Sequence, residues 1–168
     1  MGLFSRFERV THPPDDLAPP CTPEEVIEAL LDLNGPDAPW TVRDADPEEG
    51  ADLVADWHCA DPAWRKYFHS ATEDSVLQTR LRLMPGEHQV RSLDYQWQLP
   101  ATSMSRSMYT SGRGQLRWAS ASWSIERGPD GKRRIKKTVE YDTADLKNHL
   151  RDTVLDMGWS WRARFSKL

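Results

Sequence analysis

The chain has 168 residues, which is enough for one domain with a buried core and too few for two of ordinary size. A hydrophobic share of 38% beside 29% charged residues excludes a disordered chain, and no run approaches the ~20 apolar residues of a membrane-spanning helix. Cys21 and Cys59 make no disulfide framework and no secretory leader is recognised, so a cytoplasmic protein is expected.

The sequence divides into an acidic part and a basic part. Residues 1–74 contain 5 lysines and arginines against 17 aspartates and glutamates, whereas residues 75–168 contain 17 against 9. The two net charges, −12 and +8, add to the overall −4. This asymmetry predicts one acidic and one basic surface, and a basic surface usually binds an anionic partner.

Three segments are expected along the chain. Residues 1–10 carry an apolar stripe at helical spacing, which predicts a short amphipathic segment that docks on its own domain, on a partner or on a membrane surface. Four prolines predict an extended linker over 11–21. A single domain is expected over 22–168.

Two helical regions are expected in the acidic part. The first begins at Thr22, where Glu25 completes a capping box, and ends at Asn34. The second is expected over 46–68, because Asp46-Pro47 has the pattern of a helix start, with a break at residues 61–62.

In the basic part the apolar period changes to two, which is typical of strands. Strands are expected over 76–83, 90–99, 115–127 and 133–141, after a first short one over 40–43 in the acidic part. The residues 100–114, rich in serine and glycine, predict a long loop that contains a short edge strand, and a bulge is expected near residue 118.

Alternation also predicts which side chains of the strands face the core. Arg80 and Arg82 alternate with leucines and are expected to point outward. In the following strand the same reasoning turns Leu93 and Tyr95 inward and Asp94 outward.

The C-terminal part predicts a helix and a strand. An apolar stripe runs over 143–157, and Gly158 is the expected stop of this helix. Over 159–165 two tryptophans alternate with two arginines, so that the tryptophans are expected to face inward and the arginines outward.

These elements predict an α+β fold of two layers, with an antiparallel meander sheet of five or six strands and about three helices packed on one face. Most of the eight tryptophans fall on positions that face the core under this interpretation. They are therefore expected to pack the core rather than to form an aromatic cage for a ligand.

No catalytic, metal or cofactor site is predicted. His58, Cys59, Asp61 and His69 are metal-ligand residue types, but their spacing matches no closed zinc pattern. His149 lies in an acidic stripe of the last helix, and this stripe is interpreted as a solvated face. The chain also contains no nucleotide-binding loop or hydrolase motif, so a non-enzymatic protein is favoured.

The basic positions of the strands form the strongest candidate site. They are expected on the sheet face that the helices do not cover, with serine and glutamine between them. The candidate binding residues are Arg80, Arg82, Arg134, Lys136, Arg162 and Arg164.

The segments GADLVADWHCADPAWRKYF, RLRLMPGEHQVRSLDYQW and GWSWRARFSKL resemble a family of small uncharacterised proteins found in actinobacteria. The resemblance covers roughly residues 40–168 and consists mostly of core aromatic and turn residues, so it implies a shared fold and no known activity. The meander with a late apolar helix is also similar to the tubby/LURP-one-like fold of membrane-associated proteins.

The sequence therefore predicts a binding module whose basic sheet face meets an acidic protein, a membrane surface or a nucleic acid. One alternative is a small-molecule-binding protein or enzyme with a pocket between helices and sheet near Tyr67, His69 and Tyr95. Another is a protein that oligomerises through residues 1–10. A basic face that serves only solubility is the remaining alternative.

Overall fold

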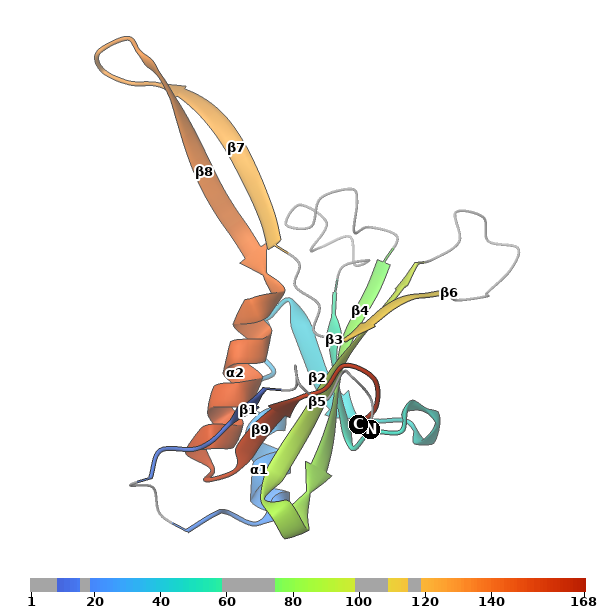
Figure 1. Ribbon diagram of the computed structural model, residues 1–168. Coiled ribbons are helices and arrows are strands. Elements are labelled where there is room, and N and C mark those ends of the chain that lie inside the picture. Colours follow the sequence, from blue (N-terminus) through green and yellow to red (C-terminus); the bar gives the residue numbers. More distant parts are fainter. Residues whose placement is uncertain (1–8, 16–18, 59–74, 99–108, 115–118) are drawn as a thin grey trace.

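The computed structural model describes residues 9–15, 19–58, 75–98, 109–114 and 119–168 (Figure 1). Its helices are α1 (Pro23–Leu31) and α2 (Thr143–Asp156), with short 3₁₀ turns η2 (Pro47–Glu49) and η3 (Pro85–Glu87). Its strands are β1 (Val10–Thr11), β2 (Trp40–Asp44), β3 (Leu53–Trp57), β4 (Ser75–Met84), β5 (Gln89–Gln98), β6 (Tyr109–Gly114), β7 (Ala119–Arg127), β8 (Arg133–Asp142) and β9 (Ser160–Ala163).

Seven of these strands form one sheet in the order β1-β9-β5-β4-β3-β2, and β6 also pairs with β5. All pairs are antiparallel except β5 with β9, which are parallel. The antiparallel α+β class expected from the sequence is thus confirmed. Two helices and two 3₁₀ turns are found in the described parts of the chain, where about three helices were expected.

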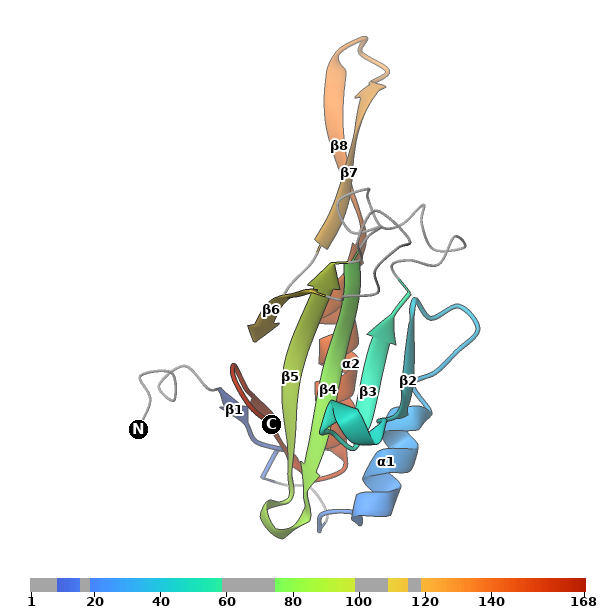
Figure 2. The ribbon, with the colours of Figure 1, turned by 90° about the vertical axis from the view of Figure 1, so that its right-hand side faces the viewer.

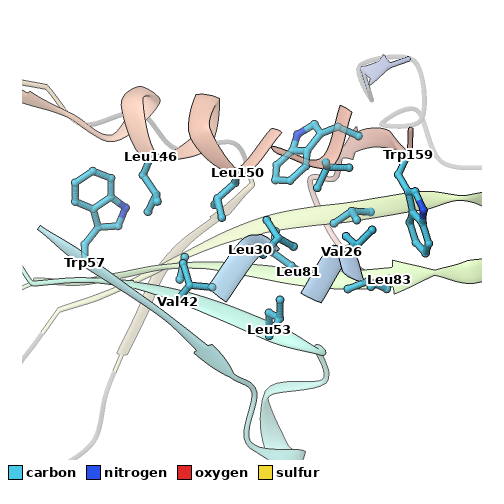
Figure 3. Packing of buried hydrophobic residues seen from close by; sticks show 14 of the residues in the cluster. Val26, Leu30, Val42, Leu53, Trp57, Leu81, Leu83, Leu146, Leu150 and Trp159 are labelled. Carbon is cyan, nitrogen blue, oxygen red and sulfur yellow. The ribbon is translucent and has the colours of Figure 1, made fainter. Parts of the chain in front are cut away.

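Both helices pack on the same face of the sheet. Val26 and Leu30 of α1 lie in one cluster with Leu146 and Leu150 of α2, and all four are fully buried against the strands (Figure 3). The two helices are also tied together at their ends, because the Cys21 amide before α1 donates to the backbone oxygen of a residue just after α2. In the described parts of the chain, the sheet thus has one face covered by helices and one face on which no helix lies.

The first helix follows from local sequence alone. Thr22 accepts a hydrogen bond from the Glu25 amide and the Glu25 carboxylate accepts one from the Thr22 amide, so the expected capping box is present. Val26 faces the core, whereas the acidic residues Glu24 and Glu28 are exposed. The acidic side chains of this helix thus lie on its outer face.

The helix expected from residue 46 onward is wrong over residues 46–57. The Asp46-Pro47 start produces only the turn η2, which Gly50 ends with φ of 61°. The following residues 53–57 form strand β3, in which Leu53, Val54 and Ala55 are each 0% exposed. Leu53 and Ala55 lie in the core cluster, whereas Val54 lies on the other face of the sheet between its cross-strand partners Arg43 and Arg80. The expected helical restart over 61–68 lies outside the described residues.

The facing of β5 also differs from the prediction. The η3 connection pairs Leu83 with Val90, so that Val90 lies on the helix side of the sheet. Alternation along β5 then places Asp94 on the helix side as well. Leu93 and Tyr95 consequently lie on the face away from the helices, although both were expected inward. Strand existence is confirmed here, whereas the side-chain facing is wrong.

Several further predictions agree with the described residues. An edge strand, β6, lies within the loop expected over 100–114, and a register shift follows Ser120, close to the bulge expected near residue 118. Helix α2 ends where expected, with Gly158 in the left-handed region at φ of 78°. Trp159 and Trp161 are buried in the core, also as expected.

Strands β7 and β8 form a second sheet of their own, a two-stranded hairpin. Figures 1 and 2 both show this hairpin extending beyond α2 and away from the seven-stranded sheet. Its turn contains Gly131, whose φ of 74° is the backbone conformation that glycine tolerates best.

Neither helix in the part of the chain that the structure describes is both long enough and apolar enough to cross a membrane. Of the segment expected to be amphipathic over residues 1–10, the structure describes only residues 9 and 10. Strand β1 begins at Val10 and pairs with β9, with Thr11 opposite Trp161.

Candidate anion-binding face

The open face is defined here as the face of the seven-stranded sheet opposite α1 and α2. Figure 2 is viewed from the side of this face, with α2 behind the strands. Leu81 and Leu83 of β4 lie in the core. Alternation along the strand therefore places Gln78, Arg80 and Arg82 on the open face. The outward position expected for the two arginines is therefore found.

Three arginines lie side by side across the open face. Arg82 of β4 pairs with Arg91 of β5, and Arg91 pairs with Arg162 of β9. Because neighbouring strands lie about 4.8 Å apart, these three residues stand at one level of the sheet with short spacings. They are called the arginine row below. The Arg82 side chain is exposed, and the other two are partly buried.

Arg164 extends the row beyond the end of β9. Its backbone amide donates to the Ser92 oxygen at 2.8 Å, which continues the hydrogen bonding of β5 with β9. Its Nε donates to the Lys167 backbone oxygen at 2.8 Å. The C-terminal segment thus holds a fourth arginine close to the row.

Arg91, at the centre of the arginine row, has a carboxylate contact that is exposed to solvent. Arg91 contacts Glu87, with Nη2 to Oε1 at 3.2 Å, and the Glu87 side chain is half exposed. Such a surface ion pair contributes little, in general about 0–1 kcal/mol. Like charges directly opposite each other on neighbouring strands destabilise a sheet.

Arg80 has a different environment although it shares the face. Its Nη1 donates to the Glu49 backbone oxygen at 2.8 Å, and its guanidinium lies 4.2 Å from the centre of the Tyr95 ring. Stacking on an aromatic ring stabilises a guanidinium by a cation–π contact. Arg80 is thus held within the fold and is less available to a partner than Arg82.

Beside Arg80, the open face carries an ion-pair network on β2 and β3. Arg43 contacts Glu49 through two hydrogen bonds of 2.8 and 2.9 Å and Asp56 through one of 2.6 Å. Asp56 also accepts from Gln78 at 2.6 Å. The hydrogen bonds from Arg43 lower the pKa of Glu49 to about 2, and the same carboxylates raise the pKa of Arg43.

The open face consequently has two electrostatically different parts. Over β2, β3 and the adjoining side of β4, Arg43 and Arg80 are balanced by Glu49 and Asp56. Over β4, β5 and β9, the three arginines of the row lie side by side on neighbouring strands.

The structure does not bring all six sequence-predicted residues together. Arg134 and Lys136 lie on β8, which belongs to the separate hairpin and not to the seven-stranded sheet. Sequence reasoning missed Arg91, because the facing predicted for β5 turned this residue inward. In the structure it lies on the open face, opposite Arg82. The length of the η3 connection is the signal that would have found it, since this length sets the register of the β4–β5 hairpin.

Tyr95 is the one residue of the alternative pocket site that the structure describes. Tyr95 lies on the open face and not between helices and sheet, while Tyr67 and His69 lie outside the described residues. The helix side instead holds a buried ion pair between Asp94 and Lys147.

The histidines considered as metal ligands have other neighbours in the structure. His58 Nε2 lies 2.7 Å from the Thr41 hydroxyl, and the exposed His149 ring lies 5.9 Å from the Trp40 ring. Within the described ranges, no three histidine, cysteine, aspartate or glutamate side chains are grouped as a metal site requires.

Comparison with protein-family models, with curated proteins and with solved structures gives no match for this chain. The resemblances to an actinobacterial family and to the tubby/LURP-one-like fold therefore stay predictions.

Proposed function

We propose that the protein is a binding module that attracts an anionic partner to the arginine row of its open face. The observation that carries the proposal is the register, which places Arg82, Arg91 and Arg162 side by side on three neighbouring strands. Such a row destabilises the sheet through like-charge repulsion. A partner with negative charge converts that repulsion into attraction.

The choice of residue type supports an oxyanion as the recognised group. A guanidinium presents a planar fork of donors that matches carboxylate or phosphate in a bidentate manner. Three forks at intervals of about 4.8 Å suit a partner with several closely spaced anionic groups better than a single small anion. Nucleic acids, anionic membranes and acidic protein segments share this chemistry.

The proposal is tested by titrating the protein with duplex DNA, single-stranded RNA, vesicles containing an anionic lipid, and an acidic peptide. Each titration is run at low and at high salt. Binding of at least one of these probes at low salt, weakened at high salt, is expected because phosphate and carboxylate contacts are screened. The absence of binding to all four probes at low salt would contradict the proposal.

A matched pair of variants separates the arginine row from general charge. Arg82→Glu with Arg162→Glu is expected to weaken binding on the order of tenfold or more, since two cationic contacts become repulsive. Arg151 lies on α2 and thus on the helix side of the domain. Arg151→Glu makes the same change from positive to negative charge at one residue and is expected to have little effect on binding. Equal losses per substitution in both variants would show that only net charge matters, and the arginines would then serve solubility.

A further inference from the structure

The outer face of α1 carries a stripe of three carboxylates. Glu24, Glu28 and Asp32 follow one another at intervals of four residues, and each is exposed. They are called the carboxylate stripe below. At about 3.6 residues per turn, these positions lie on the side of the helix opposite the buried Val26 and Leu30. The stripe therefore points away from the sheet.

The position of the stripe is unfavourable for the helix alone. Asp32 is the C-cap residue of α1, and the last turn contains no basic residue. A carboxylate at this negative end of the helix dipole is destabilising, and Glu28 and Asp32 repel each other at the i,i+4 spacing. Within the described ranges, none of the three carboxylates forms an ion pair. Cations of another molecule are therefore expected to stabilise the stripe.

The carboxylate stripe and the arginine row have similar lengths. Residues four apart in a helix are separated by about 6 Å along its axis, so the stripe spans about 12 Å. The arginine row spans about 10 Å, because Arg82, Arg91 and Arg162 lie on adjacent strands about 4.8 Å apart. Arginine side chains are long enough to bridge this difference. A helix that lies across the strands, along the row, thus brings one carboxylate to each guanidinium.

One copy of the chain cannot make this contact with itself. Val26 and Leu30 pack α1 on the face of the sheet opposite the open face. The carboxylate stripe points away from that face, and the arginine row lies on the other side of the sheet. The two surfaces can therefore meet only between different molecules.

We propose that the arginine row binds the carboxylate stripe of a second copy of this chain. This inference rests on the proposed function, because it names the anionic partner of the same row. Hydrogen bonds between guanidinium and carboxylate groups are charge-assisted and provide the contact. Since each copy uses its row for one neighbour and its stripe for another, the contact is heterologous and adds copies head to tail.

The distribution of charge favours a second copy over a nucleic acid or a membrane. Either of these would bind the row and leave the carboxylate stripe, with its unfavourable end at Asp32, without a role. A second copy uses both surfaces. It also accounts for the division of the sequence into an acidic part that contains the stripe and a basic part that contains the row.

Sedimentation of the full chain over a wide range of concentration gives the first test. The average mass of the wild type is expected to rise with concentration beyond that of a dimer, and to rise less at high salt. Arg82→Glu with Arg162→Glu reverses the row and is expected to weaken self-association on the order of tenfold or more. Glu28→Lys with Asp32→Lys reverses the stripe and is expected to have the same effect.

Glu48 and Asp156 provide the matched control, since both are exposed acidic residues outside the stripe and the row. Glu48→Lys with Asp156→Lys changes the net charge as much as the stripe variant does and is expected to keep the wild-type mass. An equal loss of association in this control would show that net charge is responsible, and would overturn the proposal.

A mixture of the two charge-reversed chains gives the second test. Each chain alone carries net charge of the same sign on its row and on its stripe. In the mixture, the reversed row of one chain meets the reversed stripe of the other, and the two unchanged surfaces also meet. Association is therefore expected to return, which also shows that both chains are folded. A mixture that stays monomeric while both chains keep the wild-type circular dichroism would overturn the proposal.

The titrations with DNA, RNA and vesicles decide separately on the proposed function. A wild-type chain that stays monomeric at low salt, while its row binds one of these probes, would overturn the second copy as partner and leave the anion-binding face in place. A monomeric chain that binds none of the probes would overturn both.

Discussion

Lys147 on α2 places its ammonium nitrogen 2.5 Å from a carboxylate oxygen of Asp94 on β5. Asp94 is 1% exposed, and its second oxygen accepts a hydrogen bond of 2.8 Å from the Thr79 hydroxyl. The pair therefore links the last helix to the centre of the sheet from within. Because both ions lose hydration on burial, the pair sets the position of the helix more than it adds stability.

Breaking this pair on one side is expected to be costly. Lys147→Met leaves the Asp94 carboxylate buried without its cation and is expected to lower the free energy of unfolding by about 3–5 kcal/mol. Replacing both partners, by Lys147→Met with Asp94→Asn, is expected to cost less than the sum of the two single changes. Urea unfolding of the four proteins of this cycle measures the difference, and strict additivity would show that the two residues do not act as a pair.

The Arg43–Glu49 contact predicts an acid-dependent part of stability. The folded-state pKa of Glu49 is about 2, lowered from 4.5 chiefly by the Arg43 hydrogen bonds. Since the folded value lies below the unfolded one, this contribution is fully present above pH 4.5 and is lost as the pH falls toward 2. It is expected to be roughly 1–2 kcal/mol after solvent screening.

Glu49→Gln removes this titration and serves as the reference. The free energies of unfolding of the wild type and the variant are expected to differ at neutral pH and to converge in acid. A series of urea unfolding curves across the acid range measures the difference. A difference that does not change with pH would contradict the assignment.

Elements with complete local signals were predictable from the sequence. The first helix has its capping box at Thr22 and Glu25, and the last has an apolar stripe ended by Gly158. The alternation in β4 likewise predicted its strand and its facing, and with them the outward positions of Arg80 and Arg82. In these cases the local pattern and the tertiary environment agree.

Residues 46–57 could not be assigned in this way. Leu53, Val54 and Trp57 fit the spacing of a helix as well as a strand buried on both faces, and short apolar runs do not separate the two. The helix-start pattern at Asp46-Pro47 was real, but it produced only a 3₁₀ turn. The choice depends on the pairing of β3 with β2 and β4, which local sequence does not contain.

The facing of β5 depends on two long-range compensations. Asp94 lies inside because Lys147, 53 residues later in the chain, supplies its cation. Leu93 is buried on the open face even though its cross-strand partner is Arg80. Because the predicted facing of β5 was wrong, Arg91 was not recognised as a residue of the open face. Arg134 and Lys136 lie on a separate hairpin and not on the expected face, because no local signal says which sheet a strand joins.

Asn34 is predicted to protect the edge strand β2. Its side-chain amide donates to the Val42 oxygen and accepts from the Val42 nitrogen, each at 2.7 Å, as a neighbouring strand would. Asn34→Ala removes both bonds and is expected to lower the free energy of unfolding by about 1–2 kcal/mol. Faster hydrogen exchange of the Val42 amide is the local measurement.

The exposed Asn148 on α2 provides the control for this change. Asn148→Ala is expected to leave both the stability and the exchange of the Val42 amide close to the wild type. Unchanged exchange at Val42 in the Asn34→Ala variant would show that the edge is protected in another way.

Trp159 combines full burial with a hydrogen bond, and the two contributions can be separated. It is 0% exposed, and its Nε1 donates to the Cys21 backbone oxygen at 2.9 Å. Trp159→Phe leaves a small cavity and an acceptor without its donor, which together are expected to lower the free energy of unfolding by about 2–4 kcal/mol.

Trp161, 5% exposed in the same core, is the matched site for the loss of ring volume. Trp161→Phe is expected to cost less by about 1–2 kcal/mol, because the bond to Cys21 then remains. Equal losses in denaturant unfolding of the two variants would mean that ring volume alone accounts for the effect.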